Sequence, residues 1–211
     1  HDPEGGIQQI YMVSVENGQI TKLAEGSSPV AMPDGHAIVF LRKGQVYYID
    51  PDQSGSEARQ LFQIRGTAGS LGWSPDGKRL AFVSHREDHS YIGIYNRRED
   101  AVRYLNPGVD HDRYPVWSPE DDRIAWIRIP YEKQIVPLFT PHKTGLPWSV
   151  WVHDFRTGED QMVWKADKGK GSVFHSVYGD NQLMWGTDDH LVFPWEKNGW
   201  VQLYSVSLES G

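Results

Sequence analysis

A ten-residue segment recurs along this chain. Residues 73–82 read WSPDGKRLAF, and 44 residues later 117–126 read WSPEDDRIAW. A copy that lacks the Trp occupies 32–40 (MPDGHAIVF), and a degraded copy occupies 185–193 (WGTDDHLVF). Self-similarity at a period of about 40–50 residues indicates a repeat architecture. This repeat therefore restricts the fold more than any bulk property of the chain.

The repeated segment has the chemistry of a β-hairpin. Pro75 presets φ for a turn, Asp76 can bond to its own backbone, and Gly77 can take a positive φ. The apolar residues before and after this turn alternate with period two, which places them on one face of two strands. Each copy therefore predicts two antiparallel strands joined by a tight turn.

A second hairpin follows the copies. Its first strand is expected at 46–50, 92–96, 150–154 and 201–205, and its partner strand at 58–62, 101–105 and 160–164. A separate strand pair at 10–15 and 19–23 flanks Asn17-Gly18, a typical hairpin turn. Four antiparallel strands per repeat are typical of a β-propeller blade.

The expected fold class is therefore all-β, with propeller blades of four antiparallel strands in one domain over 1–211. We divide it into a half blade (10–24), three blades (28–63, 68–106 and 114–165) and a partial blade (172–208). A β-sandwich with coincidentally similar hairpins is the alternative. Four blades could close if the N-terminal strands complete the last sheet. If the ring does not close in this way, we expect an incomplete ring that is a fragment of a larger propeller. An incomplete ring alone would leave sheet edges open to pairing with other chains.

Composition excludes several classes of function. The hydrophobic content of 38% is ordinary for a folded domain, and the net charge of -7 argues against nucleic acid as a partner. No apolar stretch approaches the roughly 18 residues of a membrane span. The chain has no Cys, which excludes disulfides, thiolate zinc sites and cysteine nucleophiles.

One face of the predicted blades holds most of the irregular, charged sequence. Within a blade the strands alternate in direction, so the loops between second and third strands emerge beside the connections between blades. Binding residues concentrate in loops on a rigid scaffold. The candidate substrate- or partner-binding residues on this face are His85, Asp110, His111, Asp112, Arg113, Tyr131 and Glu132. The run 110–113 could bind a cation or a substrate carboxylate, and an ion-paired loop is the alternative. The long excursion 130–146 belongs to the same face.

Catalytic and metal motifs are weak. Residues 68–72 (AGSLG) nearly match the Gly-x-Ser-x-Gly nucleophile elbow, but that motif needs a strand-to-helix turn, and strands follow here. His85 and His89 have a zinc spacing only if they lie on a helix. We expect no catalytic residue, no metal site and no cofactor in this chain.

The repeated segment is similar to the PD40, or WD40-like, repeats of TolB and of prolyl oligopeptidase-type serine peptidases. Segments after Tyr114 narrow the resemblance. The stretches 146–154 (LPWSVWVHD), 157–159, 163–166, 171–174 and 191–204 (LVFPWEKNGWVQLY) resemble the propeller of bacterial S9 peptidases, which is related to the N-terminal domain of dipeptidyl peptidase IV. The resemblance runs from about Ile10 to Tyr204.

This resemblance implies a noncatalytic propeller that gates peptide access to a C-terminal α/β-hydrolase domain. That domain would supply the catalytic Ser, Asp and His of a serine peptidase, and it is absent from these 211 residues. The implied partners are the peptide substrate and, within one protein, the hydrolase domain. The implied location is the periplasm or the exterior, with the cytoplasm as the alternative.

Two points limit what the resemblance carries. Dipeptidyl peptidases hold the substrate amine with a paired-Glu motif, whereas the nearest string here, 130–133 (PYEK), has one acid followed by Lys. A TolB-like propeller that acts only in protein–protein binding is the alternative function.

Overall fold

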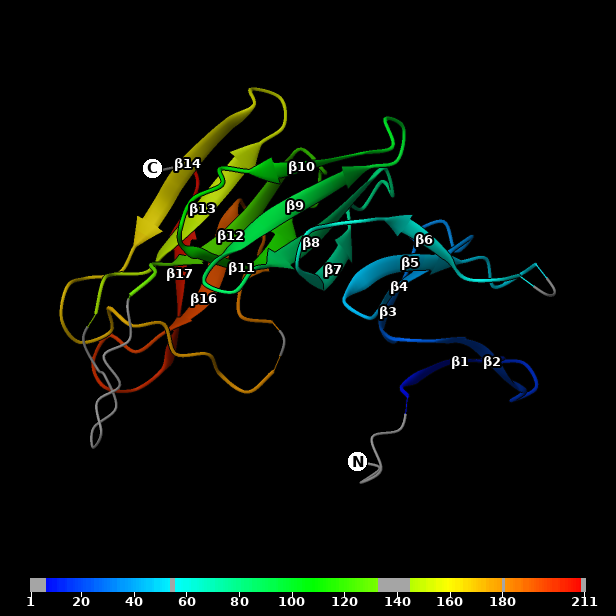
Figure 1. The fold of residues 1–211 in the computed structure, drawn as a ribbon. Coiled ribbons are helices and arrows are strands. Elements are labelled where there is room, and N and C mark those ends of the chain that lie inside the picture. The colour runs from blue at the N-terminus through cyan, green and yellow to red at the C-terminus, as the bar shows by residue number, and fades with distance from the viewer. Residues whose placement is uncertain (1–6, 54–55, 133–144, 180, 210–211) are drawn as a thin grey trace.

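The structure, a computed structural model, describes residues 7–53, 56–132, 145–179 and 181–209. All regular elements in these ranges are β-strands, which confirms the all-β class. Within the described ranges no helix is long and apolar enough to cross a membrane. Figure 1 shows the sheets following one another in chain order, with the N-terminal pair and the C-terminal strands on opposite sides of the view.

The strands form antiparallel sheets of the blade type. The N-terminal pair is β1 (Gln9–Val13) and β2 (Ile20–Glu25), and the next sheet is β3 (Ser27–Ala31), β4 (Ile38–Arg42), β5 (Gln45–Ile49) and β6 (Arg59–Phe62). Two further groups of four are β7 (Thr67–Trp73), β8 (Arg79–His85), β9 (Ser90–Asn96) and β10 (Ala101–Leu105), then β11 (His111–Trp117), β12 (Arg123–Ile129), β13 (Ser149–Asp154) and β14 (Glu159–Lys165). The last sheet is β15 (Met184–Trp185), β16 (His190–Trp195) and β17 (Gln202–Ser207).

The turn of the repeated segment forms as its residues dictate. The Ser74 hydroxyl donates to an Asp76 carboxylate oxygen at 2.7 Å, and Gly77 takes a φ of 67°. In the next group Asp121 takes a φ of 63° in the turn between its first two strands. Asp tolerates this left-handed region better than most residues, so it can form such a turn without glycine.

The core lies between successive sheets. The second strand of each group buries one large aromatic side chain at the same repeat position, and the four are Phe40, Phe82, Trp126 and Phe193. Each is fully buried, and such a side chain contributes about 1.5–3 kcal/mol to folding. Gly93 of β9 lies against the Phe82 ring, and a Cβ there would come within 2.3 Å of it. Glycine at this position is therefore what admits the ring.

A bulge interrupts the first strand of three groups. Ser28, Ser70 and Tyr114 adopt φ values of 50°, 48° and 57°, and the strand register shifts at each of them. Bulges of this kind bend a strand and increase its twist. The three first strands, with Asn181 and Leu183, line a cavity of about 480 Å³. We call this cavity the central cavity.

The two groups of strands β7–β10 and β11–β14 are joined by backbone hydrogen bonds, whereas separate blades would contact each other through side chains alone. Ser90 at the start of β9 pairs with His111 of β11 in a parallel bridge, so β7–β14 form one eight-stranded sheet. The Ser90 amide donates to the carbonyl of Asp110 at 3.1 Å, and its hydroxyl donates to the carbonyl of Asp112 at 2.8 Å. The small buried side chain of Ser90 allows this approach, which the repeat alone does not predict.

Candidate functional site

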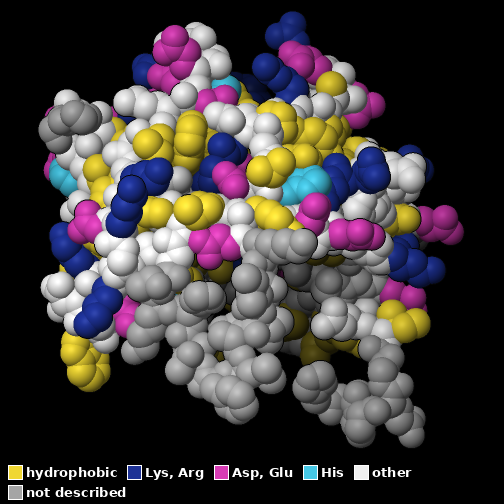
Figure 2. Space-filling model, turned by 60° about the vertical axis from the view of Figure 1, so that its left-hand side comes forward, with side chains coloured by type: hydrophobic (Ala, Val, Ile, Leu, Met, Phe, Trp, Pro, Cys, Tyr) yellow, Lys and Arg dark blue, Asp and Glu magenta, His cyan; other side chains and the backbone are white. Residues whose placement is uncertain are grey.

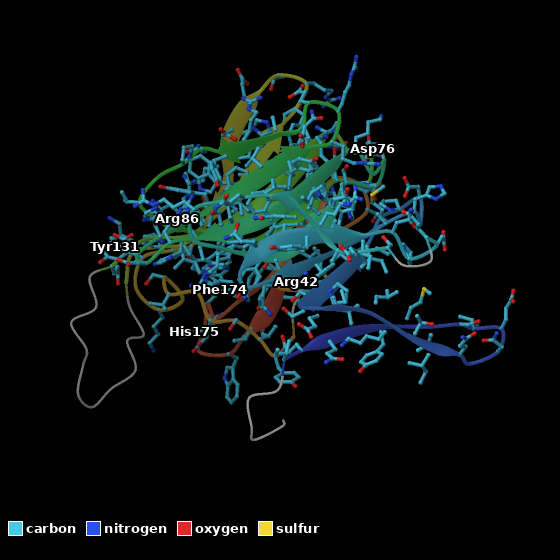
Figure 3. All side chains as sticks on the ribbon, turned by 45° about the vertical axis from the view of Figure 1, so that its right-hand side comes forward. Arg42, Asp76, Arg86, Tyr131, Phe174 and His175 are labelled. Atoms are coloured by element: carbon cyan, nitrogen blue, oxygen red, sulfur yellow. The ribbon has the colours of Figure 1, made fainter. Side chains whose placement is uncertain are left out.

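The two ends of the strands differ in character. Figure 3 shows Asp76, in the tight hairpin turn, at one end of the sheets and Arg86 and Tyr131 at the other. At the second end lie the loops between second and third strands and the connections between strand groups. We call this end the loop face. All seven candidate residues from the sequence lie on or beside it.

Strand register places two of the candidate histidines in one row. Thr67 pairs with His85, His85 with Ser90, Ser90 with His111, and His111 with Ile129. His85 ends β8 and His111 begins β11, so one strand separates them. Both side chains are half-buried. The bridge between Ser90 and His111 therefore brings the two histidines, from different strand groups, into this row.

Arg113, a residue of β11, lies near these two histidines. It lies two residues after His111 and so on the same face of the strand, and its side chain is exposed. Burial lowers the pKa of His85, and the positive charges of Arg113 and His111 lower it further. Burial and Arg113 also lower the pKa of His111, with His89 adding to this effect and Asp110 and Asp88 opposing it. Both imidazoles are thus biased towards the neutral form.

Tyr131 and Asp110 meet beside this group. The Tyr131 amide donates to an Asp110 carboxylate oxygen at 3.0 Å, and the Tyr131 ring centroid lies 6.1 Å from that of His111. The Glu132 carboxylate accepts a hydrogen bond from the Leu146 amide. This bond joins the two described ends of the 130–146 excursion, of which 133–144 lie outside the described residues.

Asp112 differs from the other candidates because it points into the protein. Its side chain is 1% exposed and accepts two hydrogen bonds from Arg128, at 2.7 and 2.8 Å. Arg128 also donates to the carbonyl of Asn106 at 2.7 Å and lies 4.7 Å from the Trp151 ring centroid. Burial raises the pKa of Asp112, while the hydrogen bonds and charge of Arg128 act in the opposite direction. With both oxygens engaged, Asp112 supports β11 rather than facing a ligand.

Two features of the loop face were missed from the sequence. One is Arg128 itself, whose position within the apolar run 124–129 was a usable signal for a buried ion pair. The other is Arg86, whose guanidinium lies 5.9 and 5.8 Å from the ring centroids of Tyr91 and Tyr104. Arg86, with the neighbouring loop residues, lines a cavity of about 560 Å³. No local motif connects these residues, because they come from different strands.

The elbow-like segment and the metal-binding candidates can be placed in the fold. Ser70, the serine of the elbow-like segment, lies in a bulge of β7 and not in a strand-to-helix turn. Across the described residues, no group of three His, Asp or Glu side chains is placed to hold a metal ion. Figure 2 shows a face on which acidic and basic side chains are interspersed with hydrophobic ones. Among its described residues, such a surface lacks the continuous basic patch that binds a polyanion.

Comparison with known proteins identifies the relatives of this fold. No protein-family model matches the sequence. Dipeptidyl-peptidase 5 of Porphyromonas gingivalis is 27% identical over 152 residues, which are 66% of this chain and 19% of that protein. The chain thus spans about a fifth of the length of this curated relative.

Two of the solved structures that match this chain do so over nearly its whole length. TolB of Agrobacterium tumefaciens matches with a TM-score of 0.53 and 18% identity, over 97% of this chain and 67% of that one. Dipeptidyl peptidase 4 of Porphyromonas gingivalis matches with a TM-score of 0.64 and 14% identity, over 95% of this chain and 34% of that one. The chain is therefore a β-propeller domain that resembles those of TolB and of bacterial dipeptidyl peptidases.

Proposed function

We propose that this chain is the noncatalytic propeller of an S9-type serine peptidase and that it controls which peptides reach a hydrolase domain elsewhere in the same protein. The observation that carries the proposal is the 27% identity to Dipeptidyl-peptidase 5, confined to a fifth of that protein. A propeller of this kind contacts its hydrolase domain within one chain. We place the protein in the periplasm or outside the cell, with the cytoplasm as the alternative.

The loop face and the central cavity support this proposal. The cavity is lined by backbone bulges and by mixed polar and apolar residues, such as Ser70, Leu71 and Tyr114. Arg113, on the loop face, directly precedes Tyr114 in β11. A rigid scaffold with an irregular, charged rim can select extended peptides by size and charge.

A second function is favoured by a different observation. The match to TolB covers 67% of that chain, a larger share than in the peptidase structure. In that case the propeller would bind a protein partner and serve no hydrolase. We keep this as the alternative because the likeness to TolB concerns the fold alone.

Substrate size tests the gating role. We would compare hydrolysis by the full-length protein of a short peptide and of a folded protein that carries the same sequence in an exposed loop. Gating predicts cleavage of the peptide and at least a tenfold lower rate on the folded protein. Unfolding the protein substrate should restore cleavage. Equal rates on both substrates would contradict gating, and no hydrolysis of either would favour the TolB-like alternative.

A further inference from the structure

We infer that Arg113, His85 and His111 form a binding site on the loop face for a carboxylate group of a peptide, next to Tyr114, which lines the central cavity. The inference rests on the proposed peptide-binding function and names the chemical group that the loop face recognises. Three observations carry it: the pairing of the nearby charges, the register of the strands and the small residue beneath His85.

The acidic side chains around this site have partners within the protein, whereas the three basic side chains have none among the described residues. Asp112 is held by Arg128, Asp110 accepts from the Tyr131 amide, and Asp88 pairs with His89 at 2.5 Å. Among the described residues, the side chains of Arg113, His85 and His111 have no hydrogen-bond or ion-pair partner within the protein. A guanidinium beside two imidazoles repels their protonation, and a bound anion would remove that repulsion.

Arg113 differs in chemical type from the residues at the same position in the first strands of the other groups. Ser27, Gly69 and Arg113 occupy the same position, immediately before the bulge of their strands. Two of these residues are small, and one is a long cation. The blade fold therefore does not require an arginine here.

Gly69 also makes room for the second base. A Cβ at this position would lie 2.9 Å from Nε2 of His85, so the imidazole lies over the glycine. His85 thus lies over β7, within the range at which the charge of Arg113 lowers its pKa. The site combines one residue of β8 with two of β11.

The donor set fits a carboxylate. A guanidinium offers two parallel N–H donors that match the two oxygens, and a neutral imidazole can donate one N–H. Asp88 and Asp110 at the rim add negative charge, which disfavours a dianion such as phosphate more than a monoanion. The carboxylate could belong to the C-terminus of a peptide or to an acidic side chain.

Binding to this site should strengthen as the pH falls. The groups that face the two histidines are Arg113, His89, Asp88 and Asp110, and the net effect on each pKa in the free protein is downward. A bound carboxylate favours the protonated imidazoles and raises both values. Affinity should therefore increase between about pH 8 and pH 5.5, where a peptide carboxylate, with a pKa near 4, stays ionised.

Calorimetry with three matched peptides tests the site. The full-length protein, treated with a serine-directed inhibitor to prevent cleavage, is titrated with acetyl-pentaalanine, with its C-terminal amide, and with the amide carrying a central Glu. We expect Arg113→Gln to weaken the first peptide, the third or both by at least tenfold and to leave the neutral amide unchanged. Which charged peptide responds identifies the source of the carboxylate.

Arg98→Gln is the control, because it removes the same charge from an exposed turn between β9 and β10 at the opposite end of the strands. His85→Gln, checked for an unchanged unfolding temperature, should weaken the charged peptide and remove part of the pH dependence. Equal affinities of wild type and Arg113→Gln for all three peptides would overturn the carboxylate site and leave peptide binding intact. Failure of all three peptides to bind would overturn both proposals.

Discussion

At the scale of single residues, the ion pair of Asp112 and Arg128 decides how β11 is held. Arg128 is 8% exposed and makes its bonds to Asp112 and Asn106 away from water. Asp112→Ala would leave the guanidinium buried without its counter-charge, and we expect a loss of about 3–5 kcal/mol in unfolding free energy. Urea unfolding followed by Trp fluorescence measures this. Glu99→Ala, at an exposed turn position, is the control, and a loss below about 1 kcal/mol for Asp112→Ala would contradict the role of the pair.

Asp76 makes the stability of its turn depend on pH. Burial opposes its ionisation, but hydrogen bonds from Ser74 and Lys78 outweigh this effect and lower the pKa to about 2. A carboxyl with a depressed pKa stabilises the fold above its unfolded value, near 3.9, and loses this contribution as the pH falls through 2. Asp76→Asn should therefore lower the melting temperature at pH 6, and the difference from wild type should shrink between pH 4 and pH 2. A difference that stays constant over this range would contradict the assignment.

At the scale of elements, arginines tie one group of strands to the next. Arg79 of β8 donates to the carbonyl of Asp121 at 2.6 Å and lies 4.1 Å from the Phe155 ring centroid. Arg123 of β12 also reaches the next group, where it donates to a carboxylate oxygen of Asp189 at 2.6 Å. Ala37 occupies the corresponding position before β4.

This tie predicts a matched pair of stability changes. Arg79→Ala removes a hydrogen bond and a cation–π contact, and we expect it to cost about 2 kcal/mol. Arg103→Ala, at an exposed position of β10, should change stability by less than about 0.5 kcal/mol. Chemical denaturation of both variants checks the pair. Equal effects of the two substitutions would show that Arg79 does not join the strand groups.

Features that depend on residues close in sequence could be predicted, whereas features that depend on contacts between distant residues could not. The hairpin turns depend on residues next to one another, such as Ser74, Asp76 and Gly77, so their strands were predictable. The bridge from Ser90 to His111 and the pair of Asp112 and Arg128 depend on packing between strand groups. An alternating pattern cannot specify such contacts. The candidate face was therefore predictable as a region, whereas the free state of Arg113 and the buried state of Asp112 were not.

At the scale of the whole molecule, the proposed function separates recognition from catalysis. The proposal assigns the central cavity and the charged rim to the propeller, and the chemistry to a domain outside these 211 residues. A serine-directed fluorophosphonate probe on the full-length protein, with the labelled peptide mapped by mass spectrometry, tests this division most directly. We expect a single labelled serine outside the present sequence, together with peptide hydrolysis that the probe abolishes. Labelling of a serine within residues 1–211, such as Ser70, or hydrolysis that resists the probe, would contradict this division.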